Sequence, residues 1–177
     1  MLDTLSDDYR ALGVALHSTR KTYGAGGHWW ARTALSEAER IGAASILDYG
    51  CGKGTFATSI KHMGWSGELF EYDPCVPGKE AQPSPADLVV CTDVLEHIEP
   101  EKIDNVLIHL RTLARKELMV TISTRPANKF LPDGRNAHLI IESPDWWFNK
   151  VNTFFGILRW EEDIRNPSEI FTILIDK

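Results

Sequence analysis

The sequence feature that most constrains the fold is a short apolar strand that runs directly into a glycine-rich turn, at residues 45–54. The order is Ser-Ile-Leu-Asp-Tyr-Gly-Cys-Gly-Lys-Gly, so Asp48 stands near the end of the strand and Gly50, Gly52 and Gly54 follow. Glycine has no Cβ and tolerates positive φ, so such a turn can be tight and a ligand can lie directly against its backbone. The segment predicts a ligand site at a strand end; a tight turn without a ligand is the alternative.

Two better-known glycine loops do not fit this segment. The phosphate-binding P-loop would need glycine in place of Leu47 and serine or threonine in place of Gly54. The dinucleotide-binding pattern G-x-G-x-x-G would need glycine in place of Thr55. The pattern that remains is D-x-G-x-G-x-G.

Composition and charge limit the class of protein. With 43% hydrophobic and 25% charged residues, we expect a single domain over residues 1–177, in which residues 1–27 form an N-terminal helix and a possible lid segment. The net charge of −6 disfavours broad, nonspecific contact with nucleic acid. The acidic start does not resemble a signal peptide, no apolar stretch is long enough to span a bilayer, and the three cysteines are scattered. We therefore expect a cytoplasmic protein with no membrane partner.

Helix and strand patterns alternate along the chain. Helices are expected over 7–18, 28–41 and 55–63 (with Thr55 as cap), from Pro100 over an amphipathic stretch, and from Pro144 to Gly156. Strands are expected over 46–49, 68–73, 86–92, 117–123, 157–165 and 169–176, the last two around a turn at Asn166-Pro167. This order predicts an α/β fold with a Rossmann-like, doubly wound, mostly parallel sheet and an antiparallel C-terminal edge.

Three segments depart from this alternation. Residues 74–85 contain four prolines and are too short for a full crossover, so we expect the third strand to be absent or vestigial. Residues 20–27 are rich in glycine and are predicted to be mobile. The long loop 124–142 is of the length at which loops are usually functional. Its cationic residues fit either a clamp for an anionic substrate or a solvated loop; they are Arg125, Lys129 and Arg135.

Several strand ends are expected to meet at one edge of the sheet. In an open parallel sheet, ligands bind at the carboxyl ends of the strands, near the reversal in strand order. The turn after Asp48, the tip at Asp73, the Thr92–Asp93 junction and the loop after Ser123 all belong to that edge. Asp73 follows the glycine turn by about twenty residues, the spacing at which an acid reaches ribose hydroxyls; a solvated strand-end acid is the alternative.

Three segments resemble motifs of a known family. Residues 46–54 (Ile-Leu-Asp-Tyr-Gly-Cys-Gly-Lys-Gly), 71–74 (Glu-Tyr-Asp-Pro) and 86–100 (Ala-Asp-Leu-Val-Val-Cys-Thr-Asp-Val-Leu-Glu-His-Ile-Glu-Pro) resemble motifs I, II and IV of the class I S-adenosylmethionine-dependent methyltransferases. The resemblance covers residues 28–177 and implies S-adenosylmethionine as cofactor. Residues 124–140 are also similar to small stand-alone methyltransferases of phage and prophage genomes.

The resemblance implies a role for each residue that matches a motif. Asp48 and Gly50 would lie near the methionine part of the cofactor, and Gly52 would allow close approach of the backbone. Asp73 would hold the ribose hydroxyls. The expected cofactor-binding residues are Asp48, Gly50, Cys51, Gly52, Asp73, Thr92 and Asp93. The usual adenine contact has no clear counterpart, so adenine recognition stays open.

Four residues, Asp93 again among them, are candidates for catalysis. Asp93, Glu96 and His97 follow each other at i, i+3 and i+4, so they share a face if this segment is helical. His138, on the loop after the next strand, can reach the same edge. We expect one of the histidines or Asp93 to accept the proton that a methyl acceptor loses.

Glu96, His97 and His138 could also bind a divalent metal. With Asp93 in place of a glutamate, they resemble the site of the metal-dependent methyltransferases that modify the terminal 2′-hydroxyl of small RNAs. The interpretation we favour is that the glutamate and the histidine tie loops together by hydrogen bonds. A Glu-His pair after this strand is common in the superfamily where no metal is known.

The favoured function is S-adenosylmethionine-dependent methyl transfer. The alternatives are a metal-dependent enzyme similar to the RNA 2′-O-methyltransferases and a non-catalytic S-adenosylmethionine-binding module. The sequence does not identify the acceptor, whether a small molecule or a nucleic acid, or the oligomeric state. Trp146 and Trp147 could stack a base, but more often one indole of such a pair lies in the core and the other covers an edge.

Overall fold

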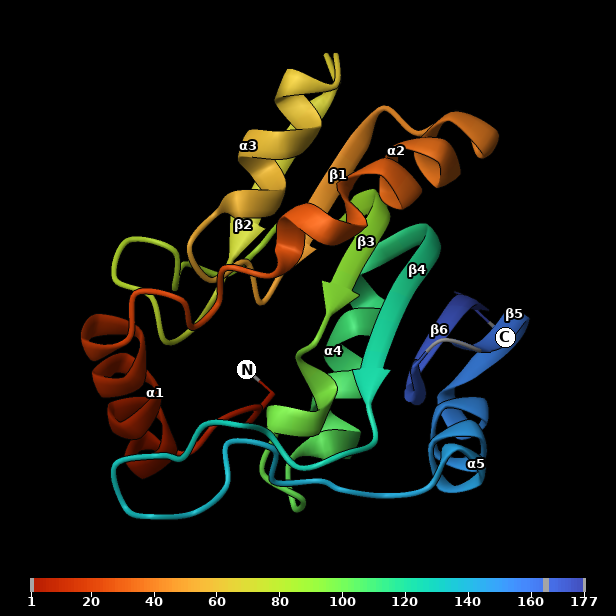
Figure 1. The fold of residues 1–177 in the computed structure, drawn as a ribbon. Helices are drawn as coiled ribbons and strands as arrows, with labels where there is room; N and C mark the ends of the chain where they lie inside the picture. The colour runs from red at the N-terminus through yellow and green to blue at the C-terminus, as the bar shows by residue number, and fades with distance from the viewer. Residues whose placement is uncertain (1, 164–165, 177) are drawn as a thin grey trace.

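A six-stranded sheet forms the centre of the computed structural model, which describes residues 2–163 and 166–176. The strand order is β2-β1-β3-β4-β6-β5 (Figure 1). The strands are β1 (Ser45–Tyr49), β2 (Glu68–Tyr72), β3 (Ala86–Thr92), β4 (Ala114–Ser123), β5 (Phe155–Asp163) and β6 (Asn166–Asp176). β1 to β4 are parallel, β6 is antiparallel to β4, and β5 is antiparallel to β6. The predicted α/β, Rossmann-like fold with an antiparallel C-terminal edge is confirmed.

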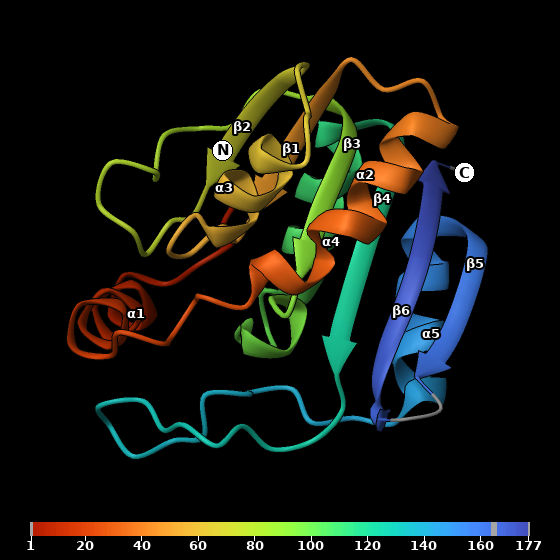
Figure 2. The same cartoon turned by 45° about the horizontal axis from the view of Figure 1, so that its top comes forward.

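Helices cover both faces of the sheet. α2 (Ala31–Arg40) and α3 (Thr55–His62) pack on one face, and α4 (Ile103–Leu113) and α5 (Pro144–Phe154) pack on the other (Figure 2). The sequence of β1 explains the two layers, because neighbouring strand residues point to opposite faces. Ile46 belongs to the cluster under α2 and α3, whereas Leu47 belongs to the cluster under α4, and both side chains are fully buried.

The remaining elements lie near the carboxyl ends of the parallel strands. They are α1 (Asp7–Thr19) and two short 3-10 helices, η1 (Gly27–Trp30) and η2 (Leu95–His97). In both views, the loop 124–142 lies beyond the arrowhead of β4, and α1 lies to one side of this end of the sheet (Figures 1 and 2). The Ser6 hydroxyl caps α1, and the Ser143 hydroxyl caps α5 as predicted. The sequence thus builds a layered scaffold with one functional edge.

Several predictions about individual elements are wrong. The absent or vestigial third strand is not supported, because six strands are present and the third in chain order, β3, lies inside the sheet between β1 and β4. β2 is joined to β3 by residues 73–85, which form neither helix nor strand. α4 begins at Ile103 rather than at Pro100. The predicted turn at Asn166-Pro167 belongs to β6, and the residues between β5 and β6 lie outside the described ranges.

The start of α3 also differs from the prediction. Its N-cap is Gly54, with φ of +73°, and no side chain caps the helix. The hydroxyl of Thr55, predicted to be the cap, donates instead to the carbonyl of Ala25 at 3.1 Å. No helix in the described ranges is long and apolar enough to cross a membrane.

Candidate active site

A cavity of about 440 Å³ opens at the carboxyl ends of the parallel strands. It lies where the strand order reverses, because the chain leaves β1 for β2 on one side and returns to β3 on the other. Its walls come from the glycine turn, the tips of β2, β3 and β4, α1, residues 22–27 and the loop 124–142. Four segments far apart in sequence meet here, as the strand-end argument predicts.

The structure brings nearly all of the predicted site residues into this one cavity. Gly52 alone among them does not line it. The lining residues from the predicted set are Asp48, Gly50, Cys51, Asp73, Thr92, Asp93, Glu96, His97 and His138. The cofactor and catalytic predictions therefore concern two ends of a single space.

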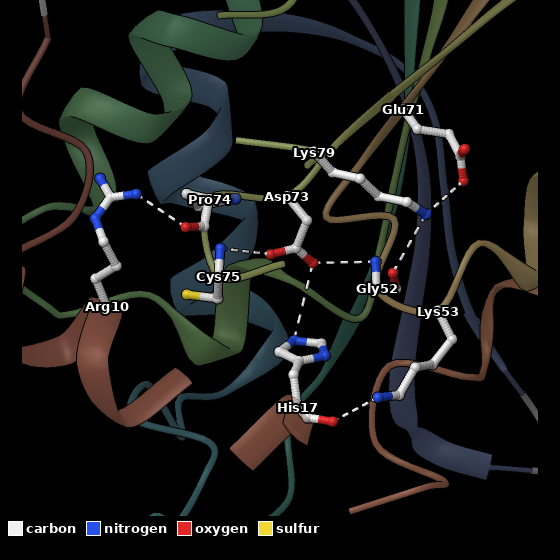
Figure 3. A network of polar contacts seen from close by, with 9 residues as sticks. All are labelled: Arg10, His17, Gly52, Lys53, Glu71, Asp73, Pro74, Cys75 and Lys79. Atoms are coloured by element: carbon white, nitrogen blue, oxygen red, sulfur yellow. Dashed lines mark hydrogen bonds and ion pairs between the residues drawn. The ribbon is translucent and has the colours of Figure 1, made fainter. Parts of the chain in front are cut away.

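Asp73 is held in place by backbone N–H groups. Its Oδ2 accepts from the N–H of Gly52 at 3.0 Å and its Oδ1 accepts from the N–H of Cys75 at 2.9 Å (Figure 3). His17 of α1 approaches the same carboxylate, with Nε2 3.9 Å from Oδ2. The carboxylate is thus fixed at the edge of the cavity, with lone pairs left over for a ligand.

The glycine turn is covered by a segment of the N-terminal region, residues 20–27, which we call the strap. The carbonyl of Gly24 accepts from the N–H of Lys53 at 2.7 Å, and the Lys53 ammonium donates to the carbonyl of His17 (Figure 3). A Cβ on Gly52 would lie 2.4 Å from the Gly24 carbonyl oxygen. The close backbone approach that the structure shows at Gly52 is a contact with the strap.

Asp48 lies buried behind the turn. Burial raises its pKa to about 8, and the neighbouring Glu71 carboxylate adds to the rise. Its Oδ2 has no hydrogen-bond partner among the described residues. Asp48, Cys51 and Glu71 place ligand atoms within 4.8 Å of one another, but the ammonium of Lys79 already bonds to Glu71 at 2.9 Å. The ammonium of Lys79 would therefore compete with a metal ion for Glu71, while Asp48 Oδ2 has no partner among the described residues.

Two oriented imidazoles form the other end of the cavity. His97 Nδ1 lies 2.7 Å from the carbonyl of Ala137, and His138 Nδ1 lies 2.6 Å from the carbonyl of Arg125. A carbonyl can only accept, so Nδ1 carries the hydrogen in both rings and Nε2 keeps its lone pair. Burial lowers the pKa of His97 to about 4 and also lowers that of His138. The lowered pKa values favour the neutral, basic form of both rings.

The two acids of this end have different environments. Glu96 is fully buried; its Oε1 accepts from the N–H of Ser123 at 2.9 Å, and its Oε2 has no partner among the described residues. Burial raises its pKa well above the ordinary value. Asp93 has φ of +54° and accepts from the Thr121 hydroxyl at 3.1 Å. Glu96, His97 and His138 place ligand atoms within 4.8 Å of one another, but Asp93 is not in that group.

Sequence reasoning missed the N-terminal residues of the cavity. His17 and Tyr23 line it, and the Tyr23 ring lies edge-on to the rings of His17 at 4.7 Å and His97 at 5.8 Å. His17 belongs to none of the motif segments. His109 of α4 also lies in no motif segment and is buried beside the Tyr49 hydroxyl. These contacts join positions far apart in sequence, so no local pattern marks them.

The remaining candidates are divided, because two line the cavity and three do not. Trp147 is 0% exposed in the core, and the half-buried Trp146 lies against it, as the interpretation of one core and one edge indole predicts. Of the three cations of the 124–142 loop, Arg125 and Lys129 line the cavity. Arg135 bonds to Asp133 in the same loop.

Unpartnered polar atoms indicate that this cavity takes a ligand. In the described ranges, four buried side-chain N or O atoms have no hydrogen-bond partner: His17 Nδ1, Asp48 Oδ2, Glu96 Oε2 and Trp147 Nε1. Three of these four residues line the cavity. Buried polar atoms without partners are costly, so such a concentration fits a site that a polar ligand completes.

The family follows from comparison with known proteins. A family model described as a methyltransferase domain matches residues 23–162. The chain belongs to this family. It is a class I S-adenosylmethionine-dependent methyltransferase, as the motifs predict. No curated protein matches the chain in sequence.

Solved methyltransferase structures share the fold. The 1,6-didemethyltoxoflavin-N1-methyltransferase of Burkholderia thailandensis, with bound 1,6-didemethyltoxoflavin and S-adenosylhomocysteine, has a TM-score of 0.67 and 16% identity over 98% of this chain and 92% of that chain. The magnesium protoporphyrin IX methyltransferase of Synechocystis PCC 6803, with bound S-adenosylhomocysteine, has a TM-score of 0.64 and 18% identity over 97% and 100%. The narrower resemblance to phage and prophage methyltransferases is not supported by these comparisons.

Proposed function

We propose that this methyltransferase binds S-adenosylmethionine across the tips of β1 and β2 and methylates an acceptor atom that carries a proton. The observation that supports this best is the composition of the cavity at the strand ends. One end has the glycine turn and the backbone-held carboxylate of Asp73, and the other has two imidazoles with free Nε2 atoms. A nucleotide-binding end and a proton-accepting end thus share one space.

At the cofactor end, Asp73 would hold the ribose hydroxyls, and Asp48, Gly50 and Cys51 would lie along the methionine part. Solved relatives hold S-adenosylhomocysteine or S-adenosylmethionine, and the unpartnered Asp48 Oδ2 fits a polar ligand there. When bound, the cofactor supplies a methyl group that is already activated, so the protein has mainly to align the reacting atoms. Thr92 and Asp93 complete this end near the acceptor.

At the acceptor end, His97 and His138 would remove the proton. Each ring donates through Nδ1 to a backbone carbonyl, which fixes the ring and leaves Nε2 to accept. A hydroxyl or a neutral amine that attacks the methyl carbon loses one proton in the transfer, while the electron pair of the broken C–S bond stays on sulfur, and a neutral Nε2 can take the proton. Asp93 accepts from the Thr121 hydroxyl and would orient the acceptor. Glu96, wholly buried, would fix the position of this wall.

The proposal also concerns the extent of the domain. We propose that residues 1–177 form one methyltransferase domain, in which residues 1–27 complete the cavity. The support is the lining itself, to which α1 and the strap contribute residues such as Tyr9, His17 and Tyr23.

Binding and transfer test the proposal separately. Calorimetric titration of S-adenosylhomocysteine should give binding to the wild type, and Asp73→Asn should weaken it about tenfold or more, because one charge-assisted hydrogen bond is lost. Asp104→Asn, on an exposed side of α4, is the matched control and should bind normally. Equal binding by both variants would contradict the assignment of Asp73.

The acceptor class is found with methyl-labelled S-adenosylmethionine and a cell extract. Label should appear in one of the small-molecule, nucleic-acid or protein fractions, and His138→Ala should lower the rate while S-adenosylhomocysteine still binds. Normal binding with no labelled fraction at all would favour a non-catalytic binding module instead.

A divalent metal site is a second candidate for the same wall. The favouring observation is that Glu96 Oε2 is buried without a partner while both imidazoles are oriented through Nδ1, the arrangement usual for metal-ligating histidines. Glu96, His97 and His138 would hold the ion. Titration of Mn²⁺ followed by electron paramagnetic resonance tests this, with His138→Ala expected to abolish binding and the exposed His62→Ala expected to retain it. If the Mn²⁺ signal does not change and methyl transfer survives chelation, His97 and His138 act only as bases.

A further inference from the structure

The helix α1 precedes the segment that the family model matches, yet it forms one wall of the cavity. Its first turn is bonded to the segment after η2. The N–H and the hydroxyl of Ser6 both donate to the carboxylate of Glu99, at 2.8 and 2.6 Å. The Tyr9 hydroxyl donates to the carbonyl of His97 at 2.6 Å. The start of α1 is therefore fixed at the acceptor end of the site.

The last turn of α1 lies at the cofactor end. It carries His17, which points its Nε2 at Asp73 Oδ2 across 3.9 Å (Figure 3). Arg10, in the first turn, also bonds next to Asp73, because its guanidinium donates to the carbonyl of Pro74 at 2.9 Å. The His17 and Asp73 side chains are only 11% and 9% exposed, and both residues line the cavity. His17 Nδ1 is buried with no hydrogen-bond partner among the described residues. The ring is held in the wall without a satisfied hydrogen bond of its own.

The separation of these two groups fits one bridging oxygen atom. A distance of 3.9 Å is too long for a direct hydrogen bond. An oxygen about 2.8 Å from each atom would bridge the gap with an angle of about 90° at that oxygen. Nε2 opposite a carboxylate carries a hydrogen to donate, and the carboxylate can only accept. The bridging group must therefore both accept and donate, as a ligand hydroxyl does, or a water molecule that such a hydroxyl would displace.

We propose that His17 is a cofactor-binding residue that holds one ribose hydroxyl of S-adenosylmethionine jointly with Asp73. His17 donates to the hydroxyl oxygen, and Asp73 accepts its hydrogen. The inference rests on the proposed function and adds to that site a residue from outside the family match. Asp73 by itself would accept a hydrogen bond from any donor. His17 donates, so a ligand group that bonds to both residues must accept from His17 as well as donate to Asp73.

The test is a double-mutant cycle between protein and ligand, measured by calorimetry. The ligands are S-adenosylhomocysteine and its 2′-deoxy and 3′-deoxy forms. We expect His17→Ala to weaken binding of S-adenosylhomocysteine about tenfold, the loss of one buried hydrogen bond. One deoxy ligand should bind the wild type more weakly and should lose nothing further with His17→Ala. His17→Gln, which keeps a donor, should recover part of the affinity, and the exposed His62→Ala should bind as the wild type does.

The outcomes separate this inference from the proposed function. If His17→Ala binds S-adenosylhomocysteine as tightly as the wild type, or weakens all three ligands equally, the role of His17 is overturned while the cofactor site stands. If the wild type binds none of the ligands, both proposals are overturned. Thermal unfolding of each variant shows whether it is folded, and His17→Gln keeps the test decisive if His17→Ala is not.

Discussion

Gly24 and Gly52 meet backbone to backbone, so that the strap lies directly on the glycine turn. A Cβ on Gly52 would come within 2.4 Å of the Gly24 carbonyl oxygen, and a Cβ on Gly24 would come within 2.7 Å of the His17 ring. Both residues have positive φ, +48° at Gly52 and +68° at Gly24. Neither position admits a side chain without displacing the other segment.

The first prediction distinguishes the effect of the contact between the strap and the glycine turn from the effect of backbone strain alone. Gly24→Ala should weaken binding of S-adenosylhomocysteine, because the methyl group would push the strap away from His17 and the turn. Gly42→Ala is the matched control, with φ of +59° and open space around its Cβ. Both variants should lose about 1–2 kcal/mol of stability from left-handed strain, but only Gly24→Ala should lose affinity. Equal affinities in calorimetry would show that the strap does not matter for binding.

The second prediction concerns the pH dependence of transfer. A base works in its unprotonated form, and burial lowers the pKa of His97 to about 4 and lowers that of His138. The acid limb of kcat/KM should therefore lie below pH 6.5, the usual value for histidine. The measurement is a pH–rate profile with labelled cofactor, once an acceptor is known. If the acid limb of kcat/KM lies at or above pH 6.5, a group other than His97 and His138 accepts the proton of the acceptor.

The third prediction concerns the stability of the ligand-free protein. The folded-state pKa of Asp48 is about 8, above its ordinary value of 3.8, because burial disfavours the charge. For an acid with a raised pKa, folding is favoured at low pH, and this contribution is lost as the pH rises from about 4 to about 8. Asp48→Asn should therefore gain stability over the wild type across that range and level off above it.

Urea unfolding at several pH values measures the effect of Asp48→Asn. Asp104→Asn, whose carboxylate is exposed and paired with Lys150, is the control and should show little change with pH. A difference between Asp48→Asn and wild type that stays constant from pH 4 to pH 8 would mean that Asp48 is charged in the fold.

The fourth prediction distinguishes the two neighbouring tryptophans of α5. Trp147→Ala should cost about 3–5 kcal/mol of unfolding free energy, because the indole fills the core. Trp146→Ala should cost clearly less, because that indole is half-buried at an edge. Neither lines the cavity, so Trp146→Ala should bind S-adenosylhomocysteine normally. If Trp146→Ala lost binding of S-adenosylhomocysteine, Trp146 would have a direct role in the site.

Local sequence patterns were sufficient where the structure depends on near neighbours. The apolar run 86–92 became the buried strand β3, and Ser143 before Pro144 became the cap of α5, because both depend on a few adjacent residues. The order of strand ends also placed Asp73 and Asp93 on one cavity, since parallel strands share an edge.

The unpredicted features depend on contacts between distant segments. The Thr55 hydroxyl bonds to the strap instead of capping α3. His17 lies next to Asp73 only because α1 packs beyond the strand ends. Residues 73–85 join two strands without a helix, which proline placement predicts, but the position of β3 inside the sheet follows from pairing with β1 and β4. Periodicity along the chain contains no information about such pairings.

The attachment of α1 at both of its ends has a consequence for any change in its length. Ser6 is bonded to Glu99 beside the acceptor groups, and His17 faces Asp73 beside the glycine turn, so the helix works as a spacer of fixed pitch between them. Adding or deleting one residue would turn one end by about 100° relative to the other. Either Ser6 or His17 would then point into solvent, and a chain of nearly unchanged composition would lose one half of its site.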